Sequence, residues 1–436
     1  MVVSAVTITL VVDTSIIKIS DLSSDYQLSF SNLKITAFII ISAVYIIAQY
    51  VILNFVKTKN TQIRDKDHML QVVHKVVTVL QYLLTAILVG VILQMIILSY
   101  YNVAILAVAT AISYMLAISM MALLALRFFR WFKSNRNSVV LFYGLSAASL
   151  LINTVFTTIF VIDILMNRPV VQYSYIDSNP PYIVPGSPID SIYNVYVTSA
   201  VMAFLLTWVA TALLLRHYSQ KLGKVKYWVI VTIPLIYFLS QFFALFINYM
   251  VSPLLTSKPI FFSILFTLIF TYSKPAGGIL FGVAFWTTAR SIHRDSIVRD
   301  YMTISAYGLM LMFVSNQAIV LVDAPYPPFG LATVSFIGLS SYLILVGIYS
   351  SAISVAQDSK LRQSIRNIAI KETKLLDSIG TAHMEQEIQK TVIRITKRNQ
   401  DRMLEETGIQ SSLSEDEMKA YLDTVISEVQ KDRNRK

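Results

Sequence analysis

The chain has 436 residues, of which 55% are hydrophobic and 14% charged, and its mean hydropathy is +0.62. This composition is too apolar for a soluble domain of that length and predicts an integral membrane protein. The formal net charge of +11 does not indicate nucleic-acid binding, because the basic residues gather in short segments beside apolar stretches, where they orient spans and meet anionic lipid headgroups. The chain has no cysteine, which excludes disulfides, thiolate metal sites and cysteine nucleophiles.

Residues 1–33 precede the first long apolar stretch. The run Val2–Val12 is too short to cross a bilayer, and no basic segment precedes it as in a secretory signal. Within it Val6, Ile8 and Leu10 alternate with threonines, which predicts a short, hairpin-like β segment. We therefore expect residues 1–33 to form an external arm that could cap the outer ends of the helices.

Nine apolar stretches follow, and each is long enough for the ~20 residues that a bilayer core requires. They run over residues 34–56, 73–98, 103–126, 139–166, 193–215, 227–250, 259–288, 301–322 and 330–356. Lys and Arg gather in every second gap, at 57–66, 127–136, 216–226 and 290–299. Because positive charge marks cytoplasmic loops, we expect an external N-terminus and a cytoplasmic C-terminus in the cell membrane. The predicted fold is all-α: a polytopic transmembrane helix bundle of about nine spans over 34–357, with a C-terminal cytoplasmic helical extension over 358–436.

Two of the predicted external loops are rich in proline. Residues 167–192 contain five prolines and three tyrosines, which predicts an irregular, rigid loop. Its tyrosines either anchor the loop at the depth of the lipid headgroups or cover an outward-facing pocket. The shorter segment 323–330 is predicted to be a stiff connector.

The clearest chemical signal is Tyr272–Gly278 (YSKPAGG), in the middle of the seventh stretch. Lys274 is predicted near the bilayer midplane, where a charge costs at least ~2.5–3.5 kcal/mol. Pro275 and the glycines after it predict a kinked or discontinuous helix, and transporters and channels place their sites at such breaks. Polar residues at a similar depth could line a cavity with Lys274, Pro275 and Tyr272: Asn153, Gln241, Asn316 and Gln317. The alternative is structural, with the amides joining helices and Lys274 bonding the carbonyl groups that the proline frees.

The composition changes abruptly at residue 358, where acids and bases begin to alternate densely. Apolar residues at steps of three and four predict a long amphipathic helix that ends near Gly408, with a phase change at Gly380 that resembles a stutter or kink more than an ideal coiled coil. Ser414 and Glu417 predict the start of a second amphipathic helix with a capping box. Two such helices bury little apolar surface alone, so we expect 358–436 to bind a protein partner, a second copy of the chain or the membrane domain.

No motif for catalysis or metal binding is present in the sequence. There is no Gly-x-Ser-x-Gly segment, no pair of intramembrane aspartates and no zinc-like spacing of histidines. His383 could pass for a phosphoacceptor, but its charged neighbours predict a solvated histidine on a helix face. We therefore expect no enzyme activity, no cofactor and no metal.

Two segments carry a resemblance to known proteins. Ser273–Trp286 (SKPAGGILFGVAFW) and Leu375–Ile388 (LLDSIGTAHMEQEI) resemble uncharacterised multi-pass membrane proteins of ammonia-oxidising archaea. The resemblance implies a multi-pass membrane protein and brings no known activity or site residue with it. In its layout alone the chain is also similar to multi-span sensor domains that act on cytoplasmic helices.

Two hypotheses for the function follow from the sequence. The first is a receptor or transducer without catalysis, in which the last span passes a conformational change to the cytoplasmic helices. The second is a small-solute transporter or channel with a site at the kinked seventh span around Lys274.

The basic loops generate a prediction about topology. Reporters at Asp21, Pro181 and Pro327 should be accessible from outside, and reporters at 59, 133, 221, 294 and 410 from the cytoplasm. Labelling of single reporters in intact cells and in inverted vesicles measures this. A cytoplasmic reporter at Pro181 would overturn the assignment.

Overall fold

The computed structural model describes residues 2–20, 27–59, 68–167, 171–172, 186–216, 223–242, 268–269, 272–292, 296–317, 320–321, 326–357, 374–407 and 424. As predicted, the long elements of this part are all helices: α1 (Val2–Ser20), α2 (Gln27–Lys59), α4 (His68–Leu98), α5 (Val103–Ser134), α6 (Ser138–Met166), α7 (Pro188–Leu215), α9 (Lys224–Ser240), α12 (Ser273–Arg290), α13 (Ile297–Ser315), α15 (Leu331–Gln357) and α17 (Lys374–Thr407). Two short strands, β1 (Tyr100–Tyr101) and β2 (Val171–Gln172), pair antiparallel.

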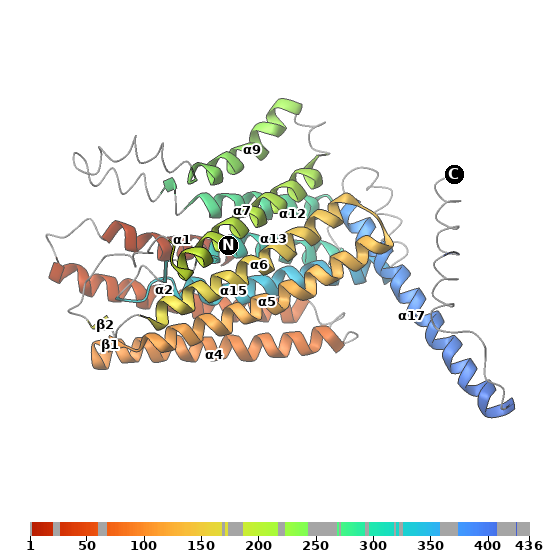
Figure 1. Cartoon of the computed structure of the whole chain (residues 1–436), viewed down its shortest axis with the longest axis horizontal. Helices are drawn as coiled ribbons and strands as arrows, with labels where there is room; N and C mark the ends of the chain where they lie inside the picture. Colours follow the sequence, from red (N-terminus) through yellow and green to blue (C-terminus); the bar gives the residue numbers. More distant parts are fainter. Residues whose placement is uncertain are drawn as a thin grey trace.

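Most of the helices lie side by side along one direction, with β1 and β2 at one end and α17 leaving from the other (Figure 1). We name the first the β end, at Leu98, Val103 and Gly330, and the second the tail end, at Ser134 and Gln357. By the predicted topology the β end is external and the tail end cytoplasmic.

Seven of the described helices are long and apolar enough to cross a membrane: α2, α4, α5, α6, α7, α13 and α15. They coincide with seven of the predicted spans. The predicted sixth and seventh spans fall on α9 and α12, which have 17 and 18 residues. Residues 243–267, between these two helices, lie outside the described residues, so the count of nine spans stays a prediction.

Residues 2–20 form the helix α1, so the predicted hairpin-like segment is wrong. Burial along α1 follows helical steps of three and four: Val6, Leu10, Asp13 and Thr14 are buried, whereas Ile8 is 65% exposed. Val6 and Leu10 fit both the period of a strand and that of a helix, and packing decides for the helix. Because α1 packs against α2, α13 and α15, this segment belongs to the bundle.

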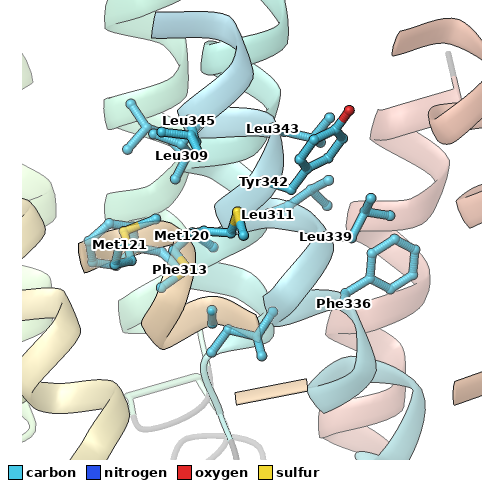
Figure 2. Packing of buried hydrophobic residues seen from close by; sticks show 14 of the residues in the cluster. Met120, Met121, Leu309, Leu311, Phe313, Phe336, Leu339, Tyr342, Leu343 and Leu345 are labelled. Atoms are coloured by element: carbon cyan, nitrogen blue, oxygen red, sulfur yellow. The ribbon is translucent and has the colours of Figure 1, made fainter. Parts of the chain in front are cut away.

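The helix α15 lies at the centre of the bundle and is buried from Leu331 to Ile353. Figure 2 shows Leu309 of α13 beside Leu345 of α15, with Met120 and Met121 of α5 near Phe313 of α13. Small residues allow this close packing. A Cβ atom at Gly308 of α13 would lie 2.7 Å from the backbone nitrogen of Ile344. The two helices could not approach this closely with a larger residue at Gly308.

The buried carboxylate of Asp13, on α1, accepts hydrogen bonds from the start of α15. The backbone nitrogen of Gly330 lies 3.2 Å from both carboxylate oxygens, the nitrogen of Thr333 lies 3.3 Å from one of them, and the Thr333 hydroxyl donates to it at 2.6 Å. The first N–H groups of a helix have no partner within the helix, and its positive end favours an anion. Asp13 therefore attaches α1 to the first turn of α15.

The β end also brings its connecting segments together. Tyr101 on β1 stacks on Tyr326 at a ring-centroid distance of 5.9 Å, and the Tyr326 hydroxyl donates to the carbonyl of Met95 at 3.4 Å. The predicted irregular loop 167–192 ends earlier than expected, because α7 already begins at Pro188. Proline is favoured in a first helical turn, and the Ser187 side chain caps that turn by accepting from the nitrogen of Asp190.

The cap on α15 generates a prediction about stability. Replacing Asp13 by alanine removes its charge-assisted hydrogen bonds and leaves buried backbone donors without a partner, so we expect unfolding to become easier by about 2–3 kcal/mol. Unfolding of the purified protein in detergent measures the change. Asp163→Ala is the matched control, because Asp163 is exposed on α6. Equal stability of the two variants would contradict the role given to Asp13.

Candidate functional site

The predicted polar site forms where α12 begins and α13 ends. Lys274 is the second residue of α12, and Asn316 follows the last residue of α13 with non-helical dihedral angles, φ −80° and ψ 61°. The Lys274 Nζ donates a hydrogen bond to the backbone carbonyl of Asn316 at 2.9 Å. Carbonyl groups at a helix C-terminus lack partners within the helix, and that end favours a cation. Lys274 thus donates to the backbone carbonyl of the buried residue Asn316 at the C-terminal end of α13.

Asn316 and Asn153 extend this contact across the bundle. The Asn316 amide donates to the side-chain oxygen of Asn153 at 3.0 Å, and Tyr114 donates to the Asn316 side-chain oxygen at 3.5 Å. The Asn153 amide in turn donates to the carbonyl of Tyr196 and to the hydroxyl of Ser199, both at 3.1 Å. We name these six residues, Lys274 included, the Lys274 network. It joins α5, α6, α7, α12 and α13.

The charge of Lys274 faces polar and aromatic groups. Its Nζ lies 5.9 Å from the ring centroid of Tyr196, near the outer limit of a cation–π contact. Among the residues that the structure describes, no carboxylate lies within ion-pair distance of Lys274. An incoming anion would therefore compete with a backbone carbonyl and not with a carboxylate.

The structure brings together only some of the residues predicted for this site. Lys274, Asn153 and Asn316 meet. The Tyr272 hydroxyl instead lies 3.0 Å from the hydroxyl of Ser15 on α1, and Gln241, at the end of α9, is partly exposed with no hydrogen bond to the network. Pro275 and Gln317 are buried beside the network without a hydrogen bond to Lys274.

Sequence reasoning missed Tyr114, Tyr196 and Ser199. It selected amides and a charge by their depth, and tyrosine and serine are too common in membrane helices to be noticed that way. Tyr196 and Ser199 are three residues apart on α7, so they share one helix face. That spacing is the feature of the sequence that could have indicated a polar face on α7. As a set, the network offers amide, hydroxyl and carbonyl groups with one amine.

A second polar region lies at the tail end, where the first half of α17 is docked on the bundle. Leu375, Leu376, Ile379 and Ala382 are buried there, and a Cβ atom at Gly380 would lie 2.7 Å from the Cβ of Val355 on α15. The helix continues through Gly380 to Thr407. Burial continues past Gly380 as far as Glu385, so the change of phase lies within the packed part of α17 and does not end the helix. The predicted stutter or kink stays a prediction.

Polar side chains also hold α17 on the bundle. The Asn137 amide donates to the Ser378 hydroxyl at 2.6 Å, and the Ser134 hydroxyl donates to the carboxylate of Glu385. His383 is buried, with its ring centroid 5.7 Å from that of Tyr349 and 6.5 Å from that of Trp131. The prediction of a solvated His383 is wrong, because aromatic rings from α5 and α15 cover this face of α17. The predicted second helix, from Ser414, lies outside the described residues.

Comparison of the chain with protein-family models, curated proteins and solved structures finds no match. The described part of the chain is an all-helical bundle with seven helices long and apolar enough to cross a membrane and a long helix docked at one end.

The Lys274 network generates a prediction for Asn153. Replacing Asn153 by leucine removes three hydrogen bonds at once, and at about 0.6–1 kcal/mol for each bond in a membrane protein we expect unfolding to become easier by about 2–3 kcal/mol. Asn54→Leu is the control, because Asn54 is an exposed amide on α2. Unfolding in detergent measures both. A silent Asn153→Leu variant would show that the network contributes nothing to stability.

Proposed function

We propose that the protein is a receptor or transducer without catalysis, which relays a change in the bundle to α17. One observation carries the proposal: α15 is buried along its length and makes specific contacts with α1 at one end and with α17 at the other. With 27 residues it is about 40 Å long, enough to connect the two sides of a bilayer.

The contacts at the two ends of α15 are of a kind that responds to small movements. At the β end its first turn is bonded to the Asp13 carboxylate, and a hydrogen bond weakens steeply when its geometry changes. At the tail end Tyr349 and Val355 touch His383 and Gly380 of α17. A shift of α15 would therefore change the position of α17 on the bundle.

The second half of α17 supports a partner in the cytoplasm. It leaves the bundle (Figure 1), and its apolar residues Ile388, Val392 and Ile395 are 47%, 36% and 54% exposed. They lie at steps of four and three, so they share one helix face. We propose that another protein or a second copy of the chain binds this face.

The relay is tested by measuring the position of α17 after a change at the β end. The native chain has no cysteine, so spin labels on Lys133→Cys and Arg398→Cys, both exposed, report one distance between α5 and α17. In lipid nanodiscs, Asp13→Ala should shift or broaden this distance, because α15 loses its cap. Double electron–electron resonance measures the distribution of distances between the two spin labels.

The matched control is Asp163→Ala, which leaves α15 untouched and should keep the distribution of the parent protein. Thr333→Val removes only one hydrogen bond to Asp13 and should give a smaller change in the same direction. A folded Asp13→Ala variant with an unchanged distribution would contradict the relay.

The alternative is a small-solute transporter or channel. It is supported by the contact between the start of α12 and the end of α13 at Lys274. Such ends leave backbone groups and partial charges available for a solute. The discriminating measurement is the reaction of Lys274→Cys with a water-soluble thiol reagent, with exposed Tyr100→Cys as the positive control and buried Ser340→Cys as the negative one. Fast reaction at position 274 would support an aqueous path and the alternative; no reaction favours the transducer.

A further inference from the structure

A cavity of about 650 Å³ lies at the tail end, where α17 leaves the bundle. Its walls come from the tail ends of α4, α5 and α15 and from one face of α17. Sequence reasoning did not point to it, because its residues are distant from one another along the chain. The polar groups that line it include His68, Arg127, Tyr349, His383, Glu387 and Lys390.

Basic groups dominate this lining. Arg127 and Lys390 are cations, His68 and His383 are imidazoles, and Glu387 is the one carboxylate among the described residues of the lining. His68 is also the first residue of α4, whose N-terminal N–H groups add a positive partial charge. The cavity therefore favours an anion.

Arg127 contacts an aromatic ring and a thioether sulfur. Its Cζ lies 4.7 Å from the ring centroid of Tyr349, and its Nη2 lies 3.5 Å from the sulfur of Met69. Within the described part of the chain, no carboxylate lies within ion-pair distance of Arg127. A guanidinium has five N–H donors in a planar fork, a geometry that suits a phosphate.

Glu387 shows that an anionic group is stable beside these cations. Its carboxylate accepts a hydrogen bond from Lys390 at 2.8 Å, and this bond lowers the pKa of Glu387 below its usual value. The charges of Lys390, His383 and Arg127 act on the Glu387 pKa in the same direction. The positive groups therefore converge on one region of the cavity.

The rest of the lining is apolar and comes from α15 and α17: Ile353, Ala356, Met384, Ile388 and Val392. We propose that this cavity binds a phosphate-bearing anion, with the phosphate bonded by Arg127 and Lys390 and an apolar part of the molecule on the α17 side. The anion would be either the headgroup of an anionic phospholipid or a soluble phosphate. Because it would contact α5 and α17 together, it would strengthen the docking of α17. This proposal does not depend on the transducer function.

The test uses the full chain and two probes. The first probe is inorganic phosphate, added to the protein in detergent, with chloride of equal ionic strength as the reference. The second is a nanodisc of phosphatidylglycerol, compared with one of phosphatidylcholine. The readout is the midpoint of thermal unfolding, which rises for any ligand that binds only the folded protein.

We expect the wild type to be stabilised by at least one probe. Arg127→Gln should need about tenfold more phosphate for the same shift, since it loses a charge-assisted hydrogen bond. Glu387→Gln should need less than the wild type, because the competing carboxylate is gone. Arg394→Gln is the control: Arg394 is exposed on α17 and does not line the cavity, so its response should equal that of the wild type.

The outcomes separate the two sources of the anion. A response to inorganic phosphate alone indicates a soluble ligand, and a response to phosphatidylglycerol alone indicates a lipid headgroup. If Arg127→Gln does not fold, Lys390→Gln and Glu387→Gln are compared with the wild type. Lys390→Gln should need more phosphate for the same shift, and Glu387→Gln should need less. The proposal is overturned if neither probe stabilises the wild type, or if Arg394→Gln weakens the response as much as the cavity variants do.

Discussion

Burial of α15 on every side governs where the other helices lie. A helix with no face left for lipid has to be contacted around its whole circumference, and α5, α13, α4, α2 and α1 supply those contacts. Lipid is as apolar as leucine, so these contacts depend on close packing and hydrogen bonds more than on the hydrophobic effect. Gly308 and Gly338 allow the close approach, the first toward α15 and the second from α15 toward α5.

Several serine hydroxyls of α15 do not disturb this burial, because they donate to carbonyls of their own helix. Ser335 donates to Leu331, Ser341 to Ile337 and Ser351 to Gly347, each one turn earlier, at 2.7–2.8 Å. A buried hydroxyl without a partner would be costly in such an interior. A helix rich in serine can therefore occupy the centre of a membrane bundle, and its polarity does not by itself indicate a pore.

The sequence predicts the long helices well and their arrangement poorly, for physical reasons. Length and apolarity suffice to predict α4 or α6, because any spanning helix needs both. The central place of α15 cannot be predicted from length and apolarity, since α15 is no more apolar than α6 or α7. The error on α1 arose because Val6 and Leu10 satisfy a period of two and a period of four equally.

The candidate sites show the same division. Asn153 and Asn316 could be associated with Lys274 from depth along the helices alone, since polar groups at one level of a bundle tend to pair. Depth carries no information about which face a residue occupies, and Gln241, predicted at the same depth, makes no hydrogen bond to the Lys274 network. His383 has charged neighbours in sequence, but Trp131 and Tyr349 cover it from helices that are distant along the chain.

The length of α17 has a mechanical consequence. Its packed part is short, and the helix continues from Glu387 to Thr407, a length of roughly 30 Å at 1.5 Å per residue. A rigid helix of that length acts as a lever arm, so a tilt of about 10° at the dock moves its tip by about 5 Å, close to one helical turn. Displacements at Val355 and Gly380 that are too small to change which residues touch would be amplified at the tip. The proposed partner, bound at the tip, would respond to the angle of α17.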